Sequence, residues 1–199
     1  MERPRIIGIG AEARLYLINL FGADLIVKER LPKKYRAKAL DLRIRKERTK
    51  NEARIMFRVS KAGIRCPRIV ALGRYSIYME RLEGVLLKDK EISSKEISEA
   101  GQILGRMHSL DIIHGDFTPA NLISDNSGNV YVIDFGLSAM ARSEEEKAVD
   151  LLLMKRYLKK NLYSLFEDAY SKTYNDSEKI LRRLEEVEKR GRYQIRTLA

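Results

Sequence analysis

Five short polar motifs follow one another along the 199-residue chain, and each lies beside an apolar segment with strand or helix character. Singly, each has an ordinary structural explanation: a hairpin turn, a charge at a strand end, a helical ion pair or a loop cap. Together, and in this order, they indicate a nucleotide-binding fold. The motifs are residues 8–13, Lys28, Glu52, residues 114–121 and residues 134–136.

The first three motifs suit the phosphates of ATP. Two glycines in the first motif let backbone N–H groups approach phosphate oxygens without obstruction by side chains. Lys28, at the end of an apolar run, offers a positive charge to the phosphates, and Glu52 would hold that flexible ammonium in position. The loop residues are Gly8, Ile9, Gly10, Ala11, Glu12 and Ala13.

The last two motifs suit a magnesium ion and proton transfer. Asn121 and Asp134 offer the hard oxygen ligands that Mg²⁺ prefers. Asp116 can accept a hydroxyl proton, or orient a water, in line with the γ-phosphate. Because phosphoryl transfer needs positioning and charge neutralisation more than covalent help, these groups could suffice for it.

The first half of the chain predicts a small β-rich lobe with one helix. Apolar residues divide residues 6–32 into short strands, and two more strands are expected at 69–72 and 77–79. Residues 34–61 favour one long helix by propensity, although their apolar stripe is irregular. Gly63 would end that helix.

The second half predicts several helices and a hairpin. A serine followed three residues later by glutamate, the capping-box pattern, occurs at Ser93 and Ser143. The helices that start there would run to Leu110 and to about Lys160. The remaining expected elements are two strands at 121–123 and 130–133, their turn at 125–129, and two helices near 162–173 and 177–190.

Nearly all of the excess positive charge lies in two segments. Lys and Arg number 39 against 28 Asp and Glu, for a net charge of +11. Residues 33–61 hold 12 basic and 3 acidic residues, and residues 189–199 hold 4 basic and no acidic residues, so the remainder is slightly acidic. This concentration favours an anionic partner over a merely solvated surface, and RNA or an acidic protein would fit it.

Cysteine content and hydropathy lead us to expect a soluble, cytoplasmic protein without membrane contact. Cys66 is the single cysteine, so a disulfide framework and a CxxC-type zinc site are excluded, and a lone thiol suits a reducing compartment. The N-terminal residues show no signal-peptide pattern. No apolar run approaches the roughly 20 residues that a membrane span requires.

The five motifs resemble the protein-kinase signature of a Gly-rich loop, a strand lysine, a helix glutamate, an HxD…N loop and DFG. Several departures from this signature narrow the choice of kinase family. Glu12 puts an acid in the phosphate loop, and Ala13 replaces its third glycine. Gly115 and Thr118 replace the usual arginine and lysine of the catalytic loop. Residues 137–142 are too few to form both a phosphorylation switch and a peptide platform, which predicts no control by phosphorylation of this loop and poor recognition of peptide substrates.

This combination resembles the small atypical kinase subunit of the KEOPS complex, the PRPK family. The residues that carry the resemblance are 10–13, 35–49, 114–121 and 190–192. RIO-type kinases and aminoglycoside phosphotransferases share the His-Gly-Asp loop but usually lack an intact DFG at the position of Asp134, and they rank lower.

The resemblance implies an α+β, compact two-lobed protein-kinase-like fold in one domain, residues 1–199. The small N-lobe would span residues 1–82, the reduced helical C-lobe 83–188 and a basic tail 189–199. It implies that ATP and Mg²⁺ bind the residues named above. Two further residues, Glu80 and Leu82, join the ATP site on the same ground.

The resemblance also implies a place beside a threonylcarbamoyl-transferase and other small KEOPS subunits, in forming threonylcarbamoyladenosine in tRNA that reads codons beginning with adenine. The basic helix and tail would contact the tRNA. Weak serine/threonine autophosphorylation and ATP hydrolysis are the implied activities. Two alternatives remain: a stand-alone RIO-like serine/threonine or small-molecule kinase, and a non-enzymatic scaffold.

Three residues near these motifs have less specific interpretations. Asp150, in the helix after the short loop, either supports the catalytic-loop backbone or is an exposed helical acid. His108 is expected to pack on a helix face, and His114 to hold the catalytic loop rather than transfer protons.

Overall fold

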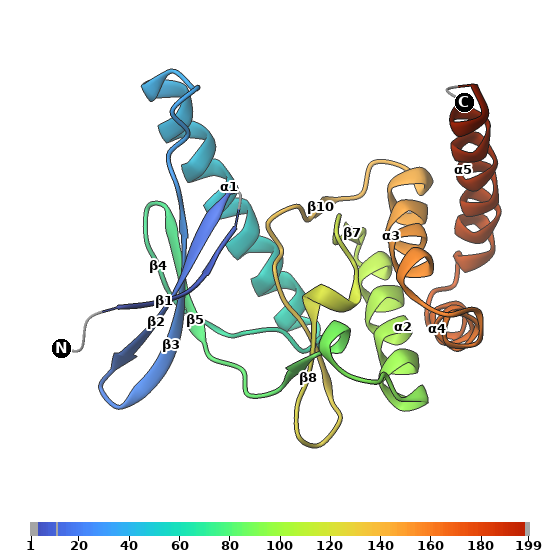
Figure 1. Ribbon diagram of the computed structural model, residues 1–199, viewed down its shortest axis with the longest axis horizontal. Coiled ribbons are helices and arrows are strands. Elements are labelled where there is room, and N and C mark those ends of the chain that lie inside the picture. Colours follow the sequence, from blue (N-terminus) through green and yellow to red (C-terminus); the bar gives the residue numbers. More distant parts are fainter. Residues whose placement is uncertain (1–3, 11, 198–199) are drawn as a thin grey trace. The chain divides into compact units, whose positions relative to one another are not determined.

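The computed structural model describes residues 4–10 and 12–197, with side chains described as far as Arg190 (Figure 1). The chain divides into two compact units, Met1–Glu83 and Gly84–Ala199.

The first unit is built on a five-stranded antiparallel sheet in the order β1-β2-β3-β5-β4. The strands predicted in residues 6–32 and at 69–72 and 77–79 are all present. The central strand β3 pairs Lys28 with Leu15 on one side and Ile77 on the other. The strands are β1 (Arg5–Ile9), β2 (Ala13–Leu20), β3 (Ala23–Arg30), β4 (Ile69–Leu72) and β5 (Ser76–Glu80).

Helix α1 (Lys38–Lys61) packs against β4 and β5 and begins at Lys38 rather than at the predicted residue 34. The reason is a competing hydrogen bond. The Asp41 carboxylate accepts the backbone N–H of Lys33 at 3.1 Å, which folds the preceding segment into a loop against the first turn. The helix ends, as predicted, just before Gly63, whose φ is +73°.

Each unit has its own apolar core. In the first unit Met56, Val59 and Ile77 are buried between α1 and the sheet. In the second, Leu104 and Phe166 are among the largest fully buried side chains. Among the helices of the described part, none is long and apolar enough to cross a membrane.

Helix α2 (Ser94–Ser109) starts at the predicted capping box. Ser93 Oγ accepts the backbone N–H of Glu96 at 3.3 Å, and the Glu96 carboxylate accepts the backbone N–H of Ser93 at 2.9 Å. Two donors that a helix N-terminus otherwise leaves unsatisfied are thereby paired.

Helix α4 (Lys160–Thr173) packs closely along α2. A Cβ added at Gly101 of α2 would lie 2.3 Å from the carbonyl oxygen of Phe166, a distance that real Cβ atoms do not adopt. Glycine at this position therefore permits the close approach of the two helices.

Helix α3 (Glu144–Tyr157) has the predicted capped start, but the predicted end near Lys160 is wrong. Leu158 is extended, with ψ of 144°, so the chain turns there before α4 begins. The last helix, α5 (Ser177–Thr197), packs on α3 and continues past the predicted end at residue 190.

Short strands complete the second unit. Strands β8 (Leu122–Ser124) and β9 (Val130–Val132) form the predicted hairpin, and β6 (Val85–Leu86) pairs with β8. Strand β7 (Ile112–Ile113) pairs with β10 (Ala139–Met140).

Candidate active site

The glycine-containing loop connects β1 and β2. Gly8 and Ile9 end β1, and the backbone N–H of Gly10 donates to the carbonyl oxygen of Ala13 at 2.9 Å, which closes the turn where β2 begins. Ala11 lies outside the described residues. The loop's expected contact with phosphates stays a prediction.

Lys28 and Glu52 have the contact expected from the sequence. Lys28 Nζ lies 2.6 Å from Glu52 Oε1, and both residues are buried, with 8% and 2% of their surface exposed. Lys28 comes from β3, and Glu52 from the face of α1 that covers the sheet. The ammonium is therefore held in one position by a charge-assisted hydrogen bond.

A second cation shares Glu52, and the sequence interpretation missed it. Arg30 Nη2 lies 2.5 Å from Glu52 Oε2, and Arg30 is 5% exposed. The alternation of side chains along a strand could have indicated Arg30, because it puts positions 28 and 30 on one face of the sheet. Glu52 thus binds Lys28 with one oxygen and Arg30 with the other.

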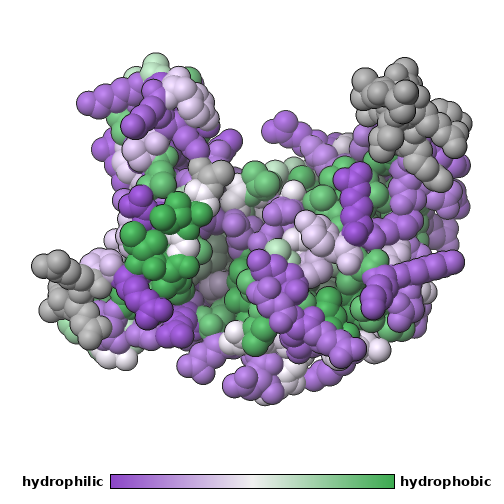
Figure 2. Space-filling view, in the orientation of Figure 1, coloured by the Kyte–Doolittle hydropathy of each residue, from purple (hydrophilic) through white to green (hydrophobic). Residues whose placement is uncertain are grey.

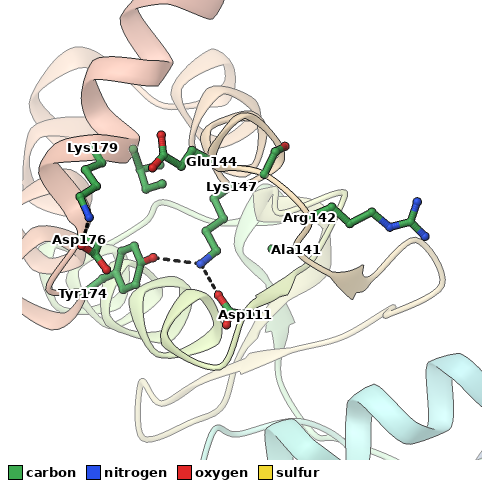
Figure 3. A pocket seen from close by; sticks show the side chains of 10 residues that line it. Asp111, Ala141, Arg142, Glu144, Lys147, Tyr174, Asp176 and Lys179 are labelled. Carbon is green, nitrogen blue, oxygen red and sulfur yellow. Dashed lines mark hydrogen bonds and ion pairs between the residues drawn. The ribbon is translucent and has the colours of Figure 1, made fainter.

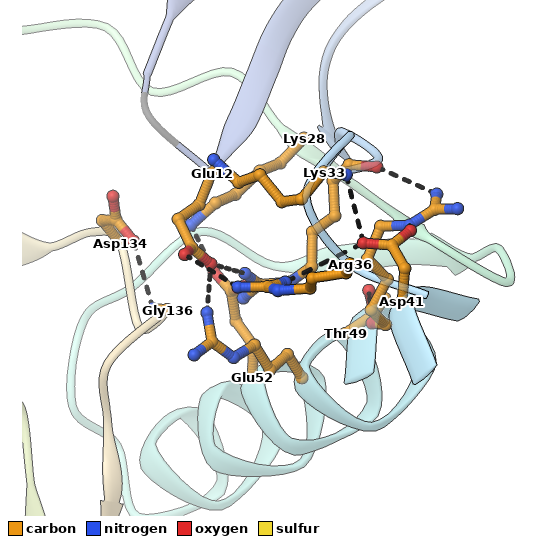
Figure 4. A network of polar contacts seen from close by, with 12 residues as sticks. Glu12, Lys28, Lys33, Arg36, Asp41, Thr49, Glu52, Asp134 and Gly136 are labelled. Atoms are coloured by element: carbon orange, nitrogen blue, oxygen red, sulfur yellow. Dashed lines mark hydrogen bonds and ion pairs between the residues drawn. The ribbon is translucent and has the colours of Figure 1, made fainter. Parts of the chain in front are cut away.

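Glu12, the acid of the glycine-containing loop, lies among three arginines (Figure 4). Its carboxylate is hydrogen-bonded to Arg48 of α1, and lies 3.8 Å from Arg30 and 4.0 Å from Arg36. Burial alone would raise the pKa of Glu12, but the hydrogen bond and charge of Arg48 outweigh it and lower the pKa. Glu12 is therefore ionised at neutral pH.

Glu80 and Leu82 lie at the end of β5 and just beyond it. The Glu80 carboxylate accepts the backbone N–H of Arg68 at 2.9 Å and its Nε at 2.7 Å. Leu82 is half-buried in the connection that follows. The Glu80 side chain therefore joins the ends of two neighbouring strands, and its expected place in the ATP site remains a prediction.

In the second unit, Asp116 and Asn121 are brought together by a short 3₁₀ helix, η2 (Pro119–Asn121). Asn121 Nδ2 donates to Asp116 Oδ2 at 2.8 Å and to the Asp116 backbone oxygen at 2.9 Å. Because the amide nitrogen is directed at Asp116, the amide oxygen is the group that Asn121 can offer to a cation.

Asp134 follows β9 and is placed by the hairpin that carries Asn121. The backbone N–H of Ile133 donates to the carbonyl oxygen of Asn121 at 3.0 Å. Asn121 directly precedes β8, and Asp134 follows β9, its antiparallel partner, so the two candidate ligands lie at the same end of the hairpin. Asp134 adopts φ of +58°, and its Oδ1 accepts the backbone N–H of Gly136 at 3.1 Å. Phe135 is fully buried, which anchors this turn in the core.

Asp150 supports the backbone of the catalytic loop, which excludes the interpretation as an exposed acid. It is 0% exposed, and its carboxylate accepts the backbone N–H groups of His114 at 2.7 Å and Gly115 at 2.8 Å. His108 Nε2 lies 3.4 Å from the same carboxylate, and His108 Nδ1 lies 2.9 Å from the hydroxyl of Tyr170. Burial lowers the pKa of His108, so its ring is neutral at pH 7.

The loop leaves no room for a side chain at Gly115. Its φ is +80°, and an added Cβ would lie 2.7 Å from the carbonyl oxygen of Leu137. Position 115 therefore requires glycine, because residue 137 lies too close to the loop for any side chain.

Asn121 and Asp134 of the second unit would suit a magnesium ion whose other ligands are phosphate oxygens and waters. Among the described residues, no group of three or more His, Cys, Asp and Glu side chains could hold a metal ion. Mg²⁺ is commonly bound through one or two carboxylates together with substrate phosphates and waters. The carboxylate of Asp134 and the amide oxygen of Asn121 are hard ligands of that kind.

A polar pocket lies elsewhere in the second unit, beside the starts of α3 and α5 (Figure 3). Its buried ammonium, Lys147 Nζ, donates to Asp111 Oδ1 at 2.7 Å and to the hydroxyl of Tyr174 at 3.0 Å. Burial would lower the pKa of Lys147, but these two partners outweigh it and raise the pKa. The lysine is therefore a satisfied structural cation.

Comparison with known proteins gives one family. The model described as the RIO domain matches residues 26–179. This chain therefore shares its domain with the RIO-type kinases, which the sequence ranks below the KEOPS kinase subunit. The resemblance to the KEOPS kinase subunit is confirmed by relatives that align along nearly their whole length. The "KEOPS complex subunit Bud32" of Pyrococcus abyssi is 35% identical, with 97% of this chain and 98% of that protein covered.

Two other relatives give similar results. The "Probable serine/threonine-protein kinase BUD32 homolog" of Archaeoglobus fulgidus is 37% identical, with 93% of this chain and 94% of that protein covered. The "Probable bifunctional tRNA threonylcarbamoyladenosine biosynthesis protein" of Methanosarcina mazei is 39% identical over 97% of this chain. This chain spans only 36% of the length of the Methanosarcina protein.

Solved structures confirm the predicted kinase-like α+β fold. The Rio2 kinase from Chaetomium thermophilum, in an ADP/Mg²⁺–phosphoaspartate complex, superposes with a TM-score of 0.69. It is 16% identical, and the match covers 96% of this chain and 70% of that one.

Proposed function

Since this chain belongs to the RIO-domain family and to its Bud32 group, we propose that it binds ATP with Mg²⁺ and acts as the kinase-like subunit of a KEOPS complex. The observation that carries the proposal is the ion pair of Lys28 and Glu52. Burying two cations against one carboxylate contributes little to stability, because desolvation offsets the attraction. A lysine held in this way beside a glycine-containing loop is better explained by a phosphate ligand.

The described residues have distinct roles in this proposal. The backbone N–H groups of residues 8–13 and the ammonium of Lys28 bind phosphate oxygens. Asp116, oriented by Asn121, accepts a proton from the attacking hydroxyl or water. Asn121 and Asp134 would hold Mg²⁺, which neutralises charge on the phosphates.

We further propose that the protein works on tRNA beside a threonylcarbamoyl-transferase and other small KEOPS subunits, in the cytoplasm. The names of the relatives support the KEOPS complex and the modification of tRNA. The surface of α1 also supports it, and hydrophilic side chains dominate the surface over its N-terminal end (Figure 2). The exposed charged residues of α1 are seven basic, Lys38, Arg43, Lys46, Lys50, Arg54, Arg58 and Lys61, and one acidic, Glu47.

This charge pattern suits the phosphate backbone of RNA better than an acidic protein. A row of basic side chains along one helix follows a chain of phosphates, and its binding weakens steeply with salt. Of the basic tail, Arg190 is paired with Glu145 of α3 at 3.0 Å, so this residue belongs to the folded second unit.

A stand-alone protein kinase is disfavoured by the segment after the DFG motif. Ser138 Oγ donates to the carbonyl oxygen of His114 at 2.9 Å, and residues 139–140 form β10 against β7. The backbone N–H of Ala141 donates to the carbonyl oxygen of Asp111 at 2.7 Å. This segment is bound to the rest of the unit, which leaves little chain to seat a peptide, and serine/threonine phosphorylation is expected to be weak.

Phosphate release from ATP tests the proposal. The chain would be assayed alone and with the transferase subunit, with Asp134→Ala as the site variant. The matched control is Asp168→Ala, which removes an exposed helical carboxylate paired with Lys172. We expect turnover that rises with the partner and is lost in Asp134→Ala only. Equal turnover in both variants would contradict the proposal.

A further inference from the structure

The acid in the glycine-containing loop poses an electrostatic problem. If this loop cradles phosphates, the Glu12 carboxylate would repel them and weaken binding. The departure from the usual kinase loop therefore needs a compensating feature. Glu12 has 42% of its side chain exposed, so a ligand in solvent would experience its charge unless other groups neutralise it.

The three arginines around Glu12 supply this neutralisation, and they come from three different segments. Arg30 ends β3, Arg36 lies in the connection to α1, and Arg48 is in the middle of α1. Arg48 makes the direct hydrogen bond to the Glu12 carboxylate. With three guanidinium groups within 4.0 Å of the carboxylate, the neighbourhood of the loop is cationic despite its acid.

The same contacts connect the loop to the lysine. Arg30 lies 3.8 Å from Glu12 and 2.5 Å from Glu52, and Glu52 holds Lys28 at 2.6 Å. The ion pairs therefore run without a break from Arg48, through Glu12, Arg30 and Glu52, to Lys28. All five residues belong to the first unit, and the ion pairs join the loop, β3 and α1.

We propose that Arg48 is a positioning residue that acts through Glu12. The ion pair holds the glycine-containing loop against α1, so that the loop N–H groups are ordered before a nucleotide binds. Arg48 also masks the negative charge of Glu12 from the phosphates. This inference rests on the proposed nucleotide site for its effect on affinity, whereas the ordering of the loop is independent of any ligand.

The proposal makes two predictions that a merely structural surface ion pair does not make. Removing Arg48 takes away the one arginine that is hydrogen-bonded to Glu12 and leaves its charge less well neutralised, so nucleotide affinity falls more in Arg48→Ala than in Arg48→Ala combined with Glu12→Gln. Loop amide exchange is as fast in this double variant as in Arg48→Ala, because neither variant contains the ion pair.

The experiment measures two quantities on the full chain: backbone amide exchange in residues 8–13 without nucleotide, and the Kd of a non-hydrolysable ATP analogue with Mg²⁺. The matched control is Arg182→Ala, which removes an exposed Arg–Glu pair with Glu178 at 3.5 Å. We expect Arg48→Ala to speed loop exchange and to raise Kd about three- to tenfold. The control leaves both unchanged.

The outcomes separate this inference from the proposed function. Loop exchange that is unaffected by Arg48→Ala, or slowed again in the double variant, overturns the inference whatever the nucleotide does. A double variant that binds no better than Arg48→Ala also overturns it. If the wild-type chain fails to bind the analogue, the proposed function fails, while the exchange measurement still decides whether the ion pair holds the loop.

Discussion

Asn121 Nδ2 donates to the Asp116 carboxylate at 2.8 Å and to the Asp116 backbone oxygen at 2.9 Å. One amide thus orients the carboxylate assigned to proton acceptance, while its oxygen is left for a cation. Two functions proposed for the second unit therefore depend on a single side chain.

Replacing Asn121 with alanine should impair both functions. We expect the kcat of phosphate release to fall by about tenfold or more, because Asp116 loses its orientation. The Mg²⁺ concentration needed for half-maximal activity should also rise. Steady-state assays over a Mg²⁺ series measure both, with the exposed turn variant Asn126→Ala as control. An unchanged kcat and Mg²⁺ requirement would refute the assignment of Asn121.

Replacing Asp150 with alanine should destabilise the second unit. Two backbone N–H groups, of the buried His114 and the half-buried Gly115, would lose their acceptor, at a cost of about 2–4 kcal/mol. Urea unfolding of the full chain measures the change, and Asp168→Ala should stay within about 0.5 kcal/mol of wild type. Equal stability of the two variants would show that Asp150 is not the support of this loop.

The close approach at Gly115 gives a third prediction. Gly115 and Gly22 both have positive φ, +80° and +83°, but a Cβ at Gly22 meets nothing within 4 Å. Alanine at either position is strained by about 1 kcal/mol, and at Gly115 it also contacts the Leu137 carbonyl oxygen at 2.7 Å. Thermal unfolding should therefore show a larger loss for Gly115→Ala. A larger loss for Gly22→Ala is the result that this account cannot explain.

Acid should weaken the protein partly through Glu96. Burial opposes its ionisation, but hydrogen bonds from Lys90, Ser124 and Ser93 lower its pKa from 4.5 to about 2. Because the pKa is lower in the folded state, this stabilisation is complete above about pH 4.5 and is lost as the pH falls toward 2. The free energy of unfolding, measured between pH 6 and pH 2.5, should fall less steeply in Glu96→Gln. Identical slopes would exclude this contribution.

Local signals predicted the elements whose ends depend on neighbouring residues. The capping box at Ser93 and the hairpin turn at 125–129 were predicted because serine, glutamate and turn residues act within a few positions. The start of α1 was wrong because the Asp41 carboxylate binds Lys33, eight residues away, and no local propensity records that bond. The end of α3 was wrong because Leu158 is extended before the next helix.

Within the candidate site, the sequence predicted only the residues that belong to the motifs. Lys28, Glu52, Asp116, Asn121 and Asp134 belong to recognisable patterns, whereas their supporting partners do not. Arg30 and Arg48 meet Glu12 only because β3 and α1 are brought to the loop by the sheet and its covering helix. Such partners depend on strand register and helix packing, which a single sequence does not specify.

Calorimetric titration of a magnesium-bound, non-hydrolysable ATP analogue into the full chain and into Lys28→Met tests the central claim most directly. Glu52 keeps its hydrogen bond to Arg30 at 2.5 Å in this variant, so the chain should remain folded, as thermal unfolding would verify. We predict binding by the wild-type chain and an affinity at least about tenfold weaker in Lys28→Met. Equal affinities, or no binding by the wild-type chain, would contradict the account.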